Sequence, residues 1–319
     1  MSPSPLRVSV IITTYNYRQF IAEAIDSALA QSQPPTEVLV IDDGSSDGTA
    51  DFVRTRYADQ PTVRVYSREN RGQLASFAEG AQLAGGDILA FLDADDVWQP
   101  NYLERVLATY AARPTVSFIY TNMRFFGAKQ GAFLPETRSR DLGLSVLLGA
   151  YATQWQASAT SALSLRRSLA LEVLDIPAHF FPKWRTRADD WLACGSDILG
   201  AHKYYLAETL VDYRAHSSNA WLDQRSDGVA SLKHWLKVET MLAHYRNSMG
   251  LGAEVKPQAL RHAKHEFRSK PKPTWRELQQ YSRLLGMSSL PWNKRIEHRA
   301  SMWSYYLKHA LNRKDGDSV

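Results

Sequence analysis

The sequence contains very little cysteine, with Cys194 the only one among 319 residues. A single cysteine excludes an internal disulfide and leaves no cysteine pair for a structural metal site, a pattern typical of a reducing compartment. No histidine and acid arrangement around Cys194 indicates a nucleophile. We therefore expect a cytoplasmic protein in which Cys194 is a core residue.

Long apolar runs are also lacking. The N-terminal segment "MSPSPLRVSV" has neither the basic leader nor the apolar region of a signal peptide. No window approaches the roughly 18 apolar residues of a membrane-spanning helix. We expect neither export nor a membrane span, although an apolar content of 44% is enough for a sizeable core.

Positive charge is concentrated near the C-terminus. Residues 228–319 contain 17 Lys and Arg against 7 Asp and Glu, whereas the rest of the chain contains 21 against 26. Helical spacing dominates the same segment, with one expected apolar stripe at Leu232, Trp235, Leu236, Val238, Met241, Leu242 and Tyr245. The sequence therefore predicts a main domain over 1–225 and a basic helical C-terminal appendage over 226–319, with a proline-interrupted hinge at 269–275.

Short apolar runs alternate with helical spacing through the first 120 residues. We expect strands at 7–13, 37–43, 62–67, 87–93 and 116–122, and helices at 20–29, 45–58, 73–84 and 100–112. Runs buried on both faces that alternate with helices indicate an α/β fold with a mostly parallel central sheet flanked by helices. The pattern loosens over 125–185, while 187–219 predicts a helix, a short strand and a polar loop.

Polar clusters follow the first four expected strands. They read "TTYN", "DDGSSD", "ENRG" and "DADD". Because sites in open α/β sheets lie at the carboxyl ends of the strands, these clusters predict one shared pocket.

The cluster "DADD" places Asp93, Asp95 and Asp96 close together. Crowded carboxylates raise one another's pKa unless a cation compensates, and Mg²⁺ or Mn²⁺ with substrate phosphates would do so. The alternative is an acidic helix start, since Asp favours a helix N-terminus. Likewise, "DDGSSDGT" is compatible with a simple turn, but not with an EF-hand, because Arg54 stands where the bidentate Glu is required. No GxGxxG dinucleotide motif follows the first strand.

In this order, "VSVIITTYN", "VIDDGSSDGT", "ENRGQLASFAEG" and "GDILAFLDADDVWQP" resemble the N-terminal half of glycosyltransferase family 2, the inverting nucleotide-sugar transferases of GT-A fold. The resemblance is close over 7–122 and looser over 185–220. It implies that Thr13 and Tyr15 line the nucleotide base pocket and that Asp43 meets the base ring. It also implies that Asp93 lies near the ribose and that Asp95 binds the metal, while the role of Asp96 stays open.

The looser part of the resemblance concerns the acceptor side and the phosphates. "RADDWLACGS" resembles the segment with the general base. Aligning Leu192 with the family's helix leucine makes Asp189 the base, which we prefer, whereas aligning the Asp-Trp pair makes it Asp190; two capping aspartates are the simpler alternative.

"DYRAHSSN" resembles the segment in which Arg214 would help hold phosphate and His216 would complete the metal shell or touch the diphosphate, although a loop histidine is also an ordinary surface residue. One departure is that many members carry Arg and Asn where this chain has Phe77 and Ala78. Asn70 and Gly72 remain, and we expect Gly72 to let the backbone approach the ligand.

Together these implications describe transfer of a sugar from a nucleotide donor, UDP-linked in our preferred interpretation, to a glycan or lipid-linked acceptor with Mn²⁺ or Mg²⁺. The alternatives are a nucleotidyltransferase, although "TTYNYRQF" lacks its glycine-rich basic loop, and a catalytically degenerate sugar-nucleotide or glycan-binding module. For the basic tail, with its Trp and Tyr residues, contact with the inner face of the plasma membrane and helix packing alone are both open; no nucleic acid is expected, because no nucleic-acid motif is present.

Overall fold

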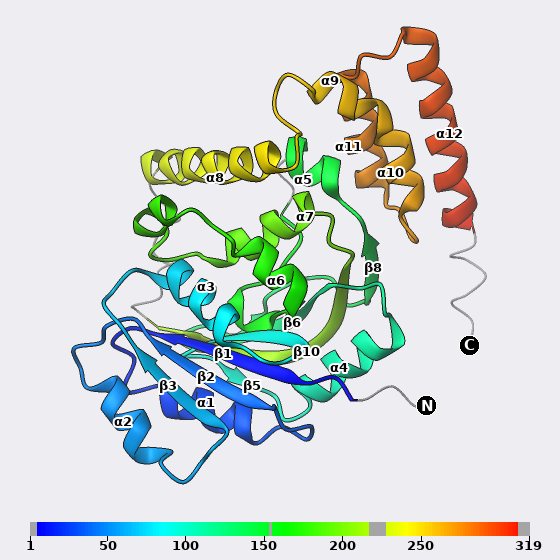
Figure 1. Cartoon of the computed structure of the whole chain (residues 1–319). Helices are drawn as coiled ribbons and strands as arrows, with labels where there is room; N and C mark the ends of the chain where they lie inside the picture. The colour runs from blue at the N-terminus through cyan, green and yellow to red at the C-terminus, as the bar shows by residue number, and fades with distance from the viewer. Residues whose placement is uncertain (1–4, 153–154, 217–227, 312–319) are drawn as a thin grey trace.

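A ten-stranded sheet forms the centre of the molecule in the computed structural model, which describes residues 5–152, 155–216 and 228–311. The strand order is β3-β2-β1-β4-β9-β6-β10-β5, with β7 beside β6 and β8 beside β10 (Figure 1). The strands are β1 Val8–Thr14, β2 Glu37–Asp42, β3 Val63–Ser67, β4 Ile88–Asp93, β5 Val97–Trp98, β6 Phe118–Gly127, β7 Gly131–Ala132, β8 Arg140–Gly143, β9 Leu163–Arg166 and β10 Lys203–Ala215.

Strands β1 to β4 run parallel, as their buried runs of β-branched residues predict. β1 lies between β2 and β4, and at its carboxyl end Thr13 is opposite Asp93 while Thr14 is opposite Asp42. The register therefore brings the polar segments that follow these strands to one edge of the sheet. The prediction of an α/β fold with a mostly parallel central sheet flanked by helices is confirmed.

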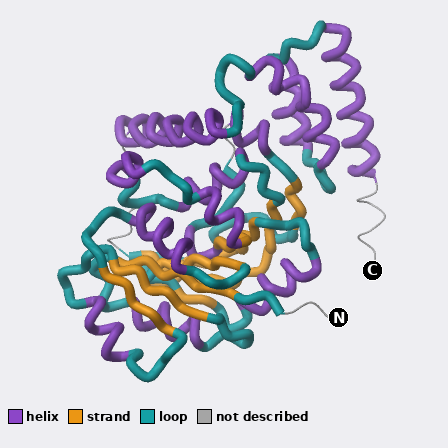
Figure 2. Tube along the Cα trace, in the orientation of Figure 1, coloured by secondary structure: helices purple, strands orange, loops and turns teal. Residues whose placement is uncertain are grey.

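Helices cover both faces of the sheet (Figure 2). Those of the main body are α1 Ile21–Leu29, α2 Thr49–Arg56, α3 Gln73–Leu83, α4 Tyr102–Ala112, α5 Val146–Ala152, α6 Arg167–Val173, α7 Ser196–Ile198 and α8 Gly228–Ser248. Successive strand residues point to opposite faces. Ile11 and Leu39 accordingly pack with α3, α6 and α8, whereas Val10 and Val40 pack with α1, α2 and α4.

The second half of the sheet differs from the sequence-based expectation. The short strand that the sequence predicts within 187–219 is β10, and it has 13 residues. It pairs with β6 along its length, with register shifts between Leu206 and Val211. β9 lies antiparallel between β4 and β6, where no strand was expected. Its sequence Leu-Ser-Leu-Arg does alternate apolar and polar residues, but four positions are too few to distinguish a strand from the loosely patterned segment around it.

Helix α8 packs onto the main body. The buried part of the expected stripe consists of Val238, Met241, Leu242 and Tyr245. Tyr245 Oη donates a hydrogen bond to the Val173 carbonyl of α6 at 2.6 Å. The prediction that Leu232, Trp235 and Leu236 share this stripe is wrong, because these three side chains are exposed. At about 100° per residue, Leu232 and Leu236 lie on the opposite side of the helix from Val238.

The remaining helices are α9 Lys256–Ala259, α10 Ala263–Ser269, α11 Trp275–Gly286 and α12 Trp292–Leu311. α10, α11 and α12 form an apolar cluster of their own, which also includes Leu147 and Leu148 of α5. The division of the chain at residue 226 stays a prediction. In the parts of the chain given above, no helix is both long and apolar enough to cross a membrane.

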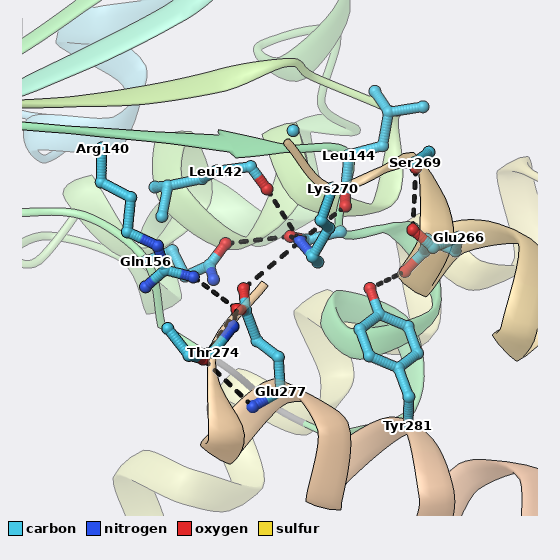
Figure 3. A network of polar contacts seen from close by, with 12 residues as sticks. Arg140, Leu142, Leu144, Gln156, Glu266, Ser269, Lys270, Thr274, Glu277 and Tyr281 are labelled. Atoms are coloured by element: carbon cyan, nitrogen blue, oxygen red, sulfur yellow. Dashed lines mark hydrogen bonds and ion pairs between the residues drawn. The ribbon is translucent and has the colours of Figure 1, made fainter. Parts of the chain in front are cut away.

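A buried polar network joins these helices to the main body (Figure 3). Lys270 Nζ donates to the carbonyls of Leu142 and Leu144, at 2.8 Å each, and lies 3.6 Å from Glu277 Oε1. Glu277 also pairs with Arg140 of β8. Burial lowers the pKa of Lys270. Because both partners of the Lys270–Glu277 pair are almost fully buried, this network fixes α10 and α11 relative to β8 and α5.

Candidate active site

A cavity of about 1080 Å³ lies at the carboxyl edge of the parallel strands. Residues from all four polar segments line it, together with the segment before the Trp191–Gly195 π-helix and the first half of α8, and residues of β6, β7, β10 and the segment before β9 form the rest of the wall. The predicted site residues in this lining are Thr13, Tyr15, Asp43, Asp93, Asp95, Asp189 and Asp190. Arg214 and His216 lie behind Asp95, outside the cavity lining formed by the described residues.

Asp43 follows β2 and organises the third polar segment. Its carboxylate accepts hydrogen bonds from the backbone N–H groups of Arg71 at 2.9 Å and Gly72 at 2.7 Å. Arg68 Nη2 lies 3.2 Å from the same carboxylate. Thr13, which is buried, and Tyr15, which is 48% exposed, line the same cavity from the end of β1. The first three strand ends therefore share one wall.

Asp93 and Asp96 lie in a concentration of negative charge. Burial raises the pKa of Asp93 well above its usual range, and the charges of Asp95 and Asp189 raise it further. Burial and then the charges of Asp95 and Asp93 do the same for the pKa of Asp96. Burial is the larger cause of both shifts, and the neighbouring carboxylates add to it; buried carboxylates this close together are the setting in which a bound cation is favourable.

Asp96, whose role the sequence leaves open, has a structural position. Its carboxylate accepts a hydrogen bond from Ser161 Oγ at 2.5 Å and one from the Arg214 backbone N–H at 2.8 Å. It is 1% exposed and is absent from the described cavity lining. Asp96 therefore ties the end of β10 to the turn before β9.

His216 and Arg214 both contact Asp95. His216 Nε2 lies 2.8 Å from Asp95 Oδ2, and its ring stacks on Phe20. Arg214 Nε donates to the Asp95 backbone carbonyl at 2.7 Å, while Nη2 pairs with Glu23 at 2.6 Å. The Arg214 guanidinium therefore holds the Asp95 backbone and is directed away from the cavity.

The donor set at Asp95 fits a divalent cation that shares its coordination shell with phosphate. Asp95 Oδ2 and His216 Nε2, which contact each other directly at 2.8 Å, are a carboxylate oxygen and an imidazole nitrogen, and ions such as Mn²⁺ accept both types of ligand. In the described chain, no group of three or more His, Cys, Asp or Glu side chains could hold a metal alone. A cation here would thus need further oxygen ligands, such as those of a diphosphate.

Asp189 and Asp190 have different surroundings. Burial raises the pKa of Asp189, and its charge acts on Asp93. Asp190 Oδ2 lies 3.3 Å from Arg187 Nε and 3.5 Å from His234 Nε2 of α8. Burial and then the charge of Asp189 raise the pKa of Asp190 to about 7. Asp190 is therefore held by partners, whereas Asp189 interacts with the acidic cluster.

Several site residues were missed by the sequence reasoning. Gln73 Nε2 donates to Asp93 Oδ1 at 3.0 Å, and Gln73 Oε1 accepts from the Ala188 backbone N–H at 3.2 Å. Gln73 therefore connects the acidic cluster with the segment that carries Asp189. The position of Gln73 directly after "ENRG" could have identified it as a site residue. Thr160, which hydrogen-bonds Asp93, and His234 lie in segments where the sequence shows no motif.

The altered third segment has a packing explanation. Phe77 is fully buried and its ring lies 4.9 Å from that of Phe91, so it belongs to the core. Gly72 has a φ of +92°, and a Cβ there would lie 2.6 Å from the Arg185 Cα. Glycine is therefore needed here for contact with the Arg185 backbone. Gly72 also lines the cavity, and its approach to a ligand stays a prediction. Cys194 is buried in the main core and also borders the cavity.

Similar solved structures share the fold. S. aureus TarS 1-349 in complex with UDP-GlcNAc has a TM-score of 0.55 at 16% identity, covering 98% of this chain and 92% of that chain. The mannosyltransferase PcManGT from Pyrobaculum calidifontis, in complex with GDP-Man and Mn²⁺, has a TM-score of 0.52 at 20% identity, covering 97% and 88%. The likeness extends over nearly the whole chain, including the helices after residue 228, and supports a GT-A fold.

Sequence comparison defines the family. An uncharacterized glycosyltransferase of Nostoc sp. is 32% identical over 67% of this chain and 66% of its own length. Three further relatives of mycobacterial origin are matched over 62% of their length, so the chain spans just under two thirds of these proteins. The family model described as "Glycosyl transferase family 2" matches residues 9–170, half of the chain and all four polar strand-end segments. This protein therefore belongs to glycosyltransferase family 2.

Proposed function

We propose that this protein is an inverting glycosyltransferase that moves a sugar from a UDP-linked donor to a glycan or lipid-linked acceptor, assisted by Mn²⁺ or Mg²⁺. One observation carries the proposal. The predicted nucleotide residues, the acidic cluster at Asp93 and Asp95, and the aspartates 189 and 190 line one cavity. Family membership favours a sugar transferase over a nucleotidyltransferase or a binding module that has lost catalysis.

On the donor side, Thr13, Tyr15 and Asp43 would bind the nucleotide base and Asp93 the ribose. Asp95 and His216 would hold the metal, which when bound supplies positive charge to the diphosphate leaving group. Arg214 would act as a positioning residue, because its guanidinium holds the Asp95 carbonyl. UDP as the nucleotide is supported by the TarS complex, although PcManGT binds GDP-Man.

On the acceptor side, Asp189 would act as the general base. It would take the proton of an acceptor hydroxyl as that oxygen attacks the anomeric carbon, while the bond from this carbon to the diphosphate oxygen breaks. Burial raises the pKa of Asp189, which makes its carboxylate a stronger base. Asp190, paired with Arg187 and His234, would keep the base segment in place. We propose a cytoplasmic location for this reaction.

A donor screen tests the proposal. Melting temperature and UDP release would be measured with UDP-GlcNAc, UDP-glucose and GDP-mannose, each with Mn²⁺ or with EDTA. We expect UDP-sugars to stabilise the protein and to be turned over only with the metal, and Asp95→Asn to abolish both effects. Asp51→Asn, on the exposed side of α2, is the matched control and should behave as the unchanged protein. Full turnover in EDTA would refute the metal role, and stabilisation by GDP-mannose alone would refute UDP.

A further inference from the structure

Helix α12 has an apolar stripe on its exposed side. Trp292, Ile296, Trp303 and Leu307 are spaced so that all four lie within about 60° around the helix axis. They are 75%, 55%, 42% and 48% exposed, respectively. The core contact of α12 is made elsewhere on the helix, chiefly by Met302, which is fully buried. The helix therefore has a second apolar side that stays largely exposed.

The stripe continues onto α11. The ring centroid of Trp275 lies 5.1 Å from that of Trp303, and Trp275 is itself 45% exposed. We call the five side chains Trp275, Trp292, Ile296, Trp303 and Leu307 the α12 face. α12 lies at the outer edge of the molecule, with α10 and α11 between it and α5 (Figure 1). The face is thus open to a large partner.

The surroundings of the α12 face are strongly basic. Residues 256–311 contain 12 Lys and Arg, of which Lys270 is buried, against 3 Asp and Glu. Of these three acids, Glu277 is buried and Glu266 is partly buried, and both hydrogen-bond to residues drawn in Figure 3. Glu297, paired with Lys294, is the remaining one. An anionic partner therefore meets little repulsion across this part of the chain.

The position of Arg299 distinguishes between an anionic surface and a second copy of the chain. Arg299 is exposed, donates to the Ser282 carbonyl at 3.1 Å, and lies midway along the stripe between Trp292 and Leu307. Two copies packed along their stripes, either parallel or antiparallel, would place Arg299 against Arg299, and like charges at an interface disfavour association. A lipid surface accepts arginine among its phosphates and tryptophan at its headgroup level.

We propose that the α12 face binds the surface of an anionic lipid bilayer, with its aromatic and aliphatic side chains in the headgroup region. The buried Lys270–Glu277 pair helps fix α11 relative to the main body. The bound protein would consequently hold its cavity in one orientation to the bilayer. The binding itself does not depend on the proposed transfer reaction; only its purpose, access to a lipid-linked acceptor, rests on that proposal.

Co-sedimentation with vesicles tests this binding. The full chain would be mixed with vesicles of phosphatidylcholine and phosphatidylglycerol in equal parts, and with phosphatidylcholine alone. We expect binding to the mixed vesicles and several-fold weaker binding without the anionic lipid. The double variant Trp292→Ser with Ile296→Ser should lose roughly ten-fold or more of the partition coefficient. The control is Leu83→Ser with Met249→Ser, two exposed apolar residues on α3 and after α8, which should bind unchanged.

Two results would overturn the proposal. The first is equal binding of the unchanged protein and the Trp292 and Ile296 double variant, or no vesicle binding by either. The second is that light scattering shows a dimer for the unchanged protein and a monomer for the double variant, while neither protein binds vesicles. The α12 face would then join two copies of the chain. Equal UDP-sugar hydrolysis by the two proteins in the absence of vesicles would show that the double variant is folded. The same assay tests the transfer proposal, so the two proposals can fail independently.

Discussion

Replacing Asp189 by Asn is the sharpest test of the site, because Asn keeps the shape of the side chain and removes its basic oxygen. Asp189 borders the cavity, and its charge contributes to the raised pKa of Asp93. Asp190, the next residue, is instead engaged with Arg187 and His234 at 3.3 and 3.5 Å. The two neighbouring aspartates should therefore give very different results when each is replaced separately.

The expected loss follows from the role of each residue. A positioned general base contributes about 10² to 10⁴ in rate, or about 3 to 5 kcal/mol of the activation barrier. We expect Asp189→Asn to lower kcat by this factor. The KM for the donor should change little, because Asp189 would act on the acceptor hydroxyl and not on the donor. Asp190→Asn keeps hydrogen-bonding atoms for Arg187 and should lower kcat by about ten-fold at most, by loosening the base segment.

The assay is UDP release from the donor found in the screen, at varied donor concentration and pH. Because burial raises the pKa of Asp189, the rate of the unchanged protein should fall with decreasing pH already above the usual range of an aspartate. That acidic limb should disappear from the residual activity of Asp189→Asn. A larger loss in Asp190→Asn would reverse the assignment, and full activity in both variants would show that the base lies elsewhere.

Three further predictions concern stability. Asp96→Ala should lower the free energy of unfolding by about 1 to 3 kcal/mol in urea denaturation, with the donor KM nearly unchanged, because the Ser161 hydroxyl and the Arg214 backbone N–H both lose their acceptor. Lys270→Met should cost about 3 to 5 kcal/mol in the same measurement, because two buried carbonyls lose a donor and buried Glu277 keeps only Arg140, whereas Lys233→Met, at an exposed position of α8, should cost almost nothing. The pKa of Asp190 is raised to about 7, so the folded state binds the Asp190 proton more tightly than the unfolded chain does. The resulting contribution to the free energy of unfolding is fully present below about pH 4 and is lost as the pH rises through 7. Asp190→Asn should therefore make the melting temperature less dependent on pH between 4 and 7 than in the unchanged protein, and an unaltered dependence would contradict the shift.

The sequence was sufficient for the first half of the fold and the donor side of the cavity. β1 and β2 are continuous buried runs, so their type and parallel pairing follow from composition. Asp43, Asp93 and Asp95 stand directly after or at the ends of such strands. Chain order then places them at one edge of the sheet, because parallel strands share a carboxyl edge.

The other side of the cavity was decided only by folding. Gln73 meets Asp93 across 20 positions in the chain, and Ala188 across 115. His234 reaches Asp190 from a helix whose sequence resembles a surface helix. Even the exposed side of α8 was misjudged, since Leu232 is as apolar as the buried Leu242. Local composition determines which segments become buried strands. Contacts between segments far apart in the chain depend instead on how those strands and helices pack. Here that packing places His234 beside Asp190 and leaves the apolar stripe of α12 exposed.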